Sequence, residues 1–155
     1  MRRRAELAGD FLVLAGALVL LASLFLTWSH QFSSRFLAEW RAAPVLAGVP
    51  HNPTAWQVYS VADVLLALLA AALPLVVLAA RRRARMVMLA AAGVALVFVV
   101  HALHIPPTNG ADFFQPMLGT PGYVANMPTA GPGESVAIIA LATAIGGLLL
   151  TMAAD

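Results

Sequence analysis

Long apolar stretches alternate with shorter polar segments along the chain. Residues 61–80 are apolar except for Asp63, and residues 86–100 carry no charge. A helix of about 20 residues spans the roughly 30 Å hydrocarbon core of a bilayer. The pattern therefore predicts four transmembrane helices, over about residues 9–28, 57–80, 86–104 and 135–153.

Arginines fill the short connection between the second and third predicted helices. This connection contains Arg81, Arg82, Arg83 and Arg85, and Arg2, Arg3 and Arg4 precede the first helix. Basic residues concentrate in the cytoplasmic segments of membrane proteins. We therefore expect both termini inside, an inner hairpin at 81–85 and outer loops at 29–56 and 105–134. The expected fold class is all-α: one integral membrane domain over residues 1–155, a four-helix bundle with two outer loops.

The composition supports the membrane class. The 155 residues are 61% hydrophobic and 10% charged, whereas a soluble domain has about 25% charged residues. The chain has no cysteine, which excludes disulfide exchange and thiolate metal sites. The arginines have a topological explanation, so we expect no nucleic-acid partner. Abundant Ala, Arg, Gly and Pro without Lys indicate a GC-rich bacterial genome. The expected location is the bacterial cytoplasmic (inner) membrane.

The two outer loops are rich in aromatic residues. In the first loop the aromatic side chains recur every four residues from Phe32, which predicts a short interfacial helix that ends before Pro44. The second loop holds six prolines and five glycines and is not expected to form regular structure. Aromatic side chains are enriched at protein interfaces. We interpret six of them as partner-binding: Phe32, Phe36, Trp40, Phe113, Phe114 and Tyr123.

Most of the ionisable side chains that could carry chemistry lie at the outer ends of the predicted helices. His101 and His104 are three residues apart and so share one helix face, a spacing compatible with two ligands of one metal. Adding His30 and Asp63 would complete a His/carboxylate set for a divalent metal. The alternative is that both histidines simply favour the negative end of their helix dipole. On that interpretation the protein has no cofactor.

Asp63 has two interpretations of its own. It lies just inside the second predicted helix, where a carboxylate must pair, reach water or be protonated. The first is functional: Asp63 relays a proton or cation, or anchors a basic residue of a partner. The second is structural: Asp63 is an early-helix acid favoured by the helix dipole and paired with Arg35, Arg41 or a histidine. No ionisable group lies in the central third of any predicted helix, which argues against a proton-driven transporter.

Small residues in the fourth predicted helix indicate close helix packing. Ala142 and Gly146 form a small-xxx-small pair, with Thr143 and Gly147 beside them. Gly16 has the same potential in the first helix. We expect these residues to pack inside the bundle.

A resemblance to a group of known proteins rests on two places in the chain. These are Trp28 after the first helix, and Ala55-Trp56 leading to Asp63-Val64-Leu65-Leu66. In these positions the chain resembles small four-span membrane proteins of actinobacteria, which pair an aromatic exit from the first helix with a Trp-led, Asp-containing second helix. The resemblance covers roughly the first half of the chain. It implies a location and an architecture but no reaction.

The function expected from these observations is non-catalytic. The chain has no evident catalytic constellation, and its outer loops present aromatic side chains suited to binding. We expect an accessory or assembly subunit that docks on a larger membrane or envelope complex, with the lipid bilayer and other membrane subunits as partners. One alternative is an enzyme or transport protein with the outer His/Asp site. Another is a self-associating structural protein, a homo-oligomer.

Overall fold

The structure is a computed structural model, described here for residues 2–32, 37–38, 50–59, 61–79, 81–106 and 129–154. In these residues four helices are long and apolar enough to cross a membrane: α1 (Arg2–Ser23), α4 (Ala62–Ala79), α5 (Arg82–His104) and α6 (Pro132–Ala154). The predictions of a mostly helical chain and of a multi-pass membrane protein are confirmed at this level. The remaining elements are α3 (Ala55–Val58), β1 (Ser29–His30) and β2 (Thr129–Ala130).

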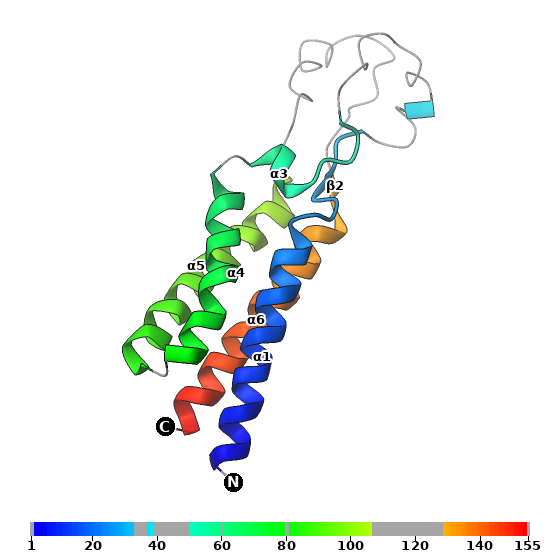
Figure 1. Cartoon of the computed structure of the whole chain (residues 1–155). Coiled ribbons are helices and arrows are strands. Elements are labelled where there is room, and N and C mark those ends of the chain that lie inside the picture. The colour runs from blue at the N-terminus through cyan, green and yellow to red at the C-terminus, as the bar shows by residue number, and fades with distance from the viewer. Residues whose placement is uncertain are drawn as a thin grey trace.

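The four long helices run side by side as a bundle (Figure 1). The most extensive contact is between α1 and α6, and α4 and α5 contact these two through the pairs α1–α4 and α5–α6. The order around the bundle is therefore α1, α6, α5, α4, which puts α4 and α6 at opposite corners. Both chain termini lie at one end of the bundle, here called the termini end. The short elements α3, β1 and β2 lie at the other end, here called the loop end.

Small residues bring α1 and α6 into backbone contact. A Cβ atom added to Gly16 would lie 2.7 Å from the carbonyl oxygen of Ala140, and one added to Gly147 would lie 2.6 Å from that of Gly9. Such close approach is typical of small residues at helix interfaces in membranes. The expectation for Gly16 holds, but that for Ala142 and Gly146 is wrong. Both are exposed, and a Cβ at Gly146 would meet nothing within 4 Å.

The segment that follows α1 organises the loop end. β1 pairs with β2 in antiparallel register, Ser29 with Ala130 and His30 with Thr129. On its other side the same segment bonds to residues 51–53, since Trp28 N donates to the Pro53 oxygen at 2.9 Å and Gln31 N donates to the His51 oxygen at 2.9 Å. The backbone after α1 is thus held between the two chain segments that lead into α3 and α6.

The first and second helices differ from their predicted bounds. α1 ends at Ser23, where the Ser23 hydroxyl bonds the Leu20 carbonyl oxygen at 2.6 Å and the next backbone bonds tighten to a spacing of three residues. The second stretch divides into α3 and α4, because Tyr59 between them has extended backbone angles, φ −118° and ψ 123°. The side chain of Gln57 supports the start of α3 by accepting a bond from Thr54 N at 3.1 Å.

The arginine run belongs to a helix instead of a loop. The predicted hairpin at 81–85 is wrong in extent, because α5 begins at Arg82 and takes in three of its four arginines. Arginine is a good helix former, and its long side chain lets the charge reach water from a helix end. Arg81, Arg82 and Arg83 are exposed, while Arg85 is buried.

Candidate functional site

The structure disperses the predicted metal ligands at the loop end. His30 donates from Nδ1 to the side-chain oxygen of Asn52 at 2.7 Å. His104 donates from Nδ1 to the Val100 carbonyl oxygen at 2.8 Å, and both it and His101 are exposed. Asp63, in contrast, is completely buried.

These positions correct the expected four-residue metal site. No group of three or more His, Asp or Glu side chains in the described part of the chain is arranged to hold a metal ion. The spacing of His101 and His104 puts them near one helix face, but nothing directs that face toward His30 or Asp63. The geometry agrees better with the alternative interpretation, two helix-terminal histidines beside solvent or headgroups.

Only one of the six predicted partner-binding aromatic residues lies among the described residues. Phe32 is 5% exposed and packs edge-on against the His51 ring at a centroid distance of 5.5 Å. It is therefore a buried contact of the loop end and is not available to a partner, which corrects the prediction. The others lie outside the described residues: Phe36, Trp40, Phe113, Phe114 and Tyr123.

A row of aromatic rings crosses the loop end of the bundle. Trp28 contacts Tyr59 at a ring-centroid distance of 5.9 Å, and Tyr59 contacts Phe98 at 5.4 Å, both nearly edge-to-face. Trp28 is fully buried, and its indole N–H donates to the Ser23 carbonyl oxygen at 2.8 Å. The row thus joins the end of α1, the entry to α4 and the side of α5.

Two carboxyl groups are buried beside this row. Asp63 is the second residue of α4 and Glu134 the third residue of α6, and both are 0% exposed. Within the described part of the chain, no oxygen of either carboxyl group has a hydrogen-bond partner. The Tyr59 backbone approaches Asp63 without reaching hydrogen-bond geometry. Buried polar groups are normally satisfied, so four orphaned carboxyl oxygens at one end of a bundle mark an unusual place.

The charges of both acids affect the pKa of the Tyr59 phenol. Burial, and then the negative charges of Glu134 and Asp63, raise the pKa of the Tyr59 phenol from 10.0 to about 12. Both carboxyl groups are therefore within electrostatic reach of the same hydroxyl. We call Asp63, Glu134 and Tyr59 the loop-end acid cluster.

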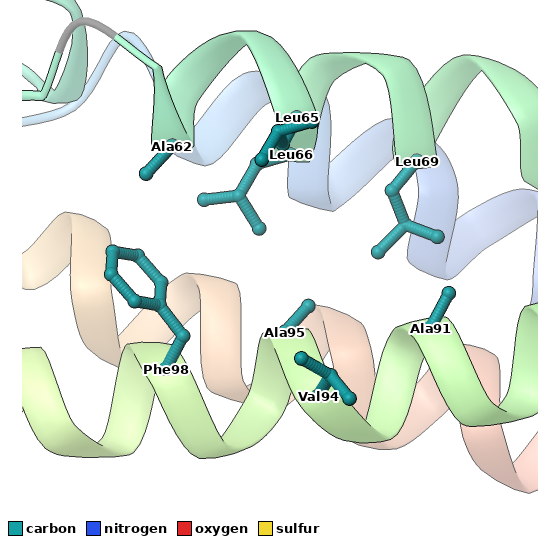
Figure 2. Close-up of a pocket in the computed structure, with 8 residues that line it drawn as sticks. All are labelled: Ala62, Leu65, Leu66, Leu69, Ala91, Val94, Ala95 and Phe98. Atoms are coloured by element: carbon teal, nitrogen blue, oxygen red, sulfur yellow. The ribbon is translucent and has the colours of Figure 1, made fainter.

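A second feature is an apolar groove between α4 and α5. It encloses about 470 Å³ (Figure 2). Every lining residue is apolar: Ala62, Leu65, Leu66, Leu69, Ala91, Val94, Ala95 and Phe98. The groove opens on the bundle surface, since Leu65 and Val94 are 60% and 72% exposed. It can hold only an apolar object, such as a helix face or an acyl chain.

Sequence reasoning identified Asp63 but not the cluster. Glu134 has the same placement as Asp63, in the first turn of an apolar helix, and that shared position was the available signal. The groove could not be predicted from the sequence. In a membrane helix, a face that packs against a neighbour and a face that stays open have the same apolar composition.

Comparison with known proteins returns no relative. No family model matches the chain, and no curated protein or solved structure matches it.

Proposed function

We propose that the protein is a non-catalytic accessory subunit of a larger complex in the bacterial cytoplasmic membrane, and that the groove between α4 and α5 receives a transmembrane helix of a partner subunit. The observation that carries the proposal is the shape of this groove. Its eight apolar lining residues include Ala62, Ala91 and Ala95, and larger side chains flank them.

The alanines favour a helix as the occupant. Helix association in membranes depends on close packing, and small residues allow two backbones to approach. The contact between α1 and α6 shows this mode within the same chain, because Gly16 there lies against the backbone of Ala140. Among the principal helix pairs, α4 and α5 share the least contact. A partner helix would supply the packing that these two helices do not supply to each other.

The orientation follows from charge. Arg2, Arg3 and Arg4 begin α1, and Arg82, Arg83 and Arg85 begin α5. These starts lie toward the termini end, which the excess of arginine assigns to the cytoplasm. The loop end then faces outward, where a partner subunit of the envelope would also be reached.

The test replaces a small lining residue of the groove with a larger one. An Ala95→Leu variant adds bulk to the groove lining, and Ala142→Leu makes the same change on an exposed face of α6. Wild-type protein, gently extracted from its source membrane, is expected to retain a stoichiometric partner chain in native mass spectrometry. Ala95→Leu should lose that chain and Ala142→Leu should keep it.

Three outcomes would contradict the proposal. Lipid as the only companion of the wild-type protein would assign the groove to an acyl chain. A discrete homo-oligomer without other chains would support the self-associating structural protein instead. Retention of the partner by Ala95→Leu would show that docking uses another surface.

A further inference from the structure

Three exposed arginines lie where α4 and α5 meet, at the termini end of the bundle (Figure 1). Arg81 precedes α5, and Arg82 and Arg83 are the first two residues of that helix. We call these three residues the turn arginines. In a chain that crosses a membrane, a turn between two spanning helices lies at the level of the lipid headgroups.

The described helices around this turn offer no negative charge to balance it. α5 contains no acidic residue, and the acids of α4 and α6, Asp63 and Glu134, lie in first turns at the loop end. Glu6 and Asp10 lie nearer the termini end, but they belong to α1, which occupies the corner opposite α5. Within the described part of the chain, the charge of the turn arginines is therefore not neutralised by a neighbouring acid.

An exposed apolar surface continues directly from the turn arginines. Met86 and Val87 follow Arg82 and Arg83 by four residues each, so each shares a helix face with its arginine. Both are more than half exposed, and Leu78 in the last turn of α4 is 81% exposed. We call Leu78, Met86 and Val87 the adjoining apolar surface. Positive charge and apolar surface thus follow one another along the bundle, in the same order as the headgroup and acyl chains of a lipid.

The chemistry of this region suits a phosphate that carries acyl chains. A guanidinium group keeps its charge and binds phosphate oxygens through two parallel hydrogen bonds. Basic clusters beside transmembrane helices attract anionic lipids, and each residue near the membrane surface contributes about fivefold in affinity. A soluble phosphate would contact the arginines but would leave the adjoining apolar surface uncovered.

We propose that the turn arginines bind the headgroup phosphate of an anionic phospholipid, whose acyl chains lie against the adjoining apolar surface. A zwitterionic lipid fits less well, because its own positive group would lie close to three arginines. The termini end is also the end that the proposed orientation assigns to the cytoplasm, where the membrane surface is negatively charged.

This lipid surface is separate from the groove that receives the partner helix in the proposed function. The groove is lined between Ala62 and Leu69 on α4 and between Ala91 and Phe98 on α5. None of the turn arginines and none of the adjoining apolar residues belongs to that lining. Because the lipid is measured on the purified protein alone, a failure of this proposal leaves partner docking unaffected.

The experiment compares two lipids at a tryptophan placed on the adjoining apolar surface. Met86→Trp is reconstituted into bilayers that mix phosphatidylglycerol and phosphatidylcholine of the same chain length. Bromine atoms on the acyl chains of one lipid quench a tryptophan that they contact, which gives the relative binding constant of the two lipids. The signal of the native Trp28, Trp40 and Trp56 is measured on the unmodified protein and subtracted. We expect the constant to favour phosphatidylglycerol by about fivefold or more.

Matched variants locate the preference. Arg→Gln changes at all three turn arginines should bring the constant in Met86→Trp close to one. Arg2→Gln, Arg3→Gln and Arg4→Gln together remove the same charge from α1, at the opposite corner, and should leave the constant unchanged. Equal losses in the two triple variants would show that only the total charge of the protein matters and would overturn the proposal.

Two measurements on Met86→Trp with intact arginines do not depend on the folding of a charge variant. A high concentration of sodium chloride screens exposed charges, so the preference for phosphatidylglycerol should decrease. Soluble glycerol phosphate in excess should not displace the lipid, because it has no acyl chains. Displacement by glycerol phosphate would assign the turn to a free phosphate. A constant of one in Met86→Trp would show that the arginines bind no anionic lipid.

Discussion

The contact between α1 and α6 permits a sharp test with two neighbouring glycines. Gly147 faces α1, and a Cβ added there would lie 2.6 Å from the Gly9 oxygen, 2.8 Å from Val13 N and 2.9 Å from Leu12 Cβ. Gly146, one residue earlier, faces open space, with nothing within 4 Å of its added Cβ. The same Gly→Ala change therefore meets opposite environments on one helix.

The expected difference can be worked from these contacts. Ordinary separations between carbon atoms are about 3.5–4.0 Å, so the Gly147→Ala methyl group forces the two backbones apart. Overpacking of this kind costs about 1–3 kcal/mol. The gain in helix propensity from Gly to Ala, about 1 kcal/mol, applies to both positions and cancels. Gly147→Ala should therefore be less stable than Gly146→Ala by about 1–3 kcal/mol.

The assay is equilibrium unfolding in mixed micelles with increasing sodium dodecyl sulfate, followed by circular dichroism and tryptophan fluorescence. Gly146→Ala should unfold at the wild-type midpoint or above it. Gly147→Ala should unfold earlier, and the larger Gly147→Val earlier still. Equal midpoints for Gly147→Ala and Gly146→Ala would refute the assignment of the α1-facing side of α6.

Two further predictions concern the loop end. In Tyr123→Phe protein, Tyr59 should ionise near pH 12, above the ordinary 10.0, and Glu134→Gln should lower this midpoint because it removes a negative charge. Since the pKa of Tyr59 is raised by folding, its contribution to stability should be full below pH 10 and lost as the pH rises toward 12. Trp28→Phe removes the bond from the indole N–H to the Ser23 oxygen, 2.8 Å long, and leaves that oxygen with the bond from the Leu26 backbone N–H. Loss of this one hydrogen bond should lower the free energy of unfolding by about 0.5–1.5 kcal/mol in the same detergent titration, whereas an unchanged midpoint would contradict this role.

The apolar helices were predictable because membrane insertion is a property of each segment by itself. Hydropathy over about 20 residues decides whether a stretch can cross the hydrocarbon core, and this sum needs no knowledge of neighbours. The third and fourth helices, for example, begin and end within four residues of the predicted bounds, at Arg82–His104 and Pro132–Ala154. Their ends moved where a good helix former such as arginine continued a helix, as at Arg82.

Which face of each helix packs was decided only by the tertiary structure. Ala142 and Gly146 have the same small-xxx-small spacing as Ala140 and Ala144, yet the first pair is exposed and the second is buried. In a soluble helix the polar face would have revealed the rotation. In a helix that is apolar all round, the orientation depends on the shape of the neighbouring helix.

The loop-end acid cluster illustrates the same division. The sequence placed Asp63 just inside the second predicted helix and Glu134 at the end of the second outer loop, 71 residues further along the chain. In the packed bundle the charges of both acids raise the pKa of the Tyr59 phenol. The same assembly left His101 and His104 exposed and turned Phe32 inward. Hydropathy is a sum over neighbouring residues, so the sequence by itself determined which segments can cross a membrane. The burial of a side chain and its distance from other side chains depend on contacts between helices, so only the tertiary structure decided them.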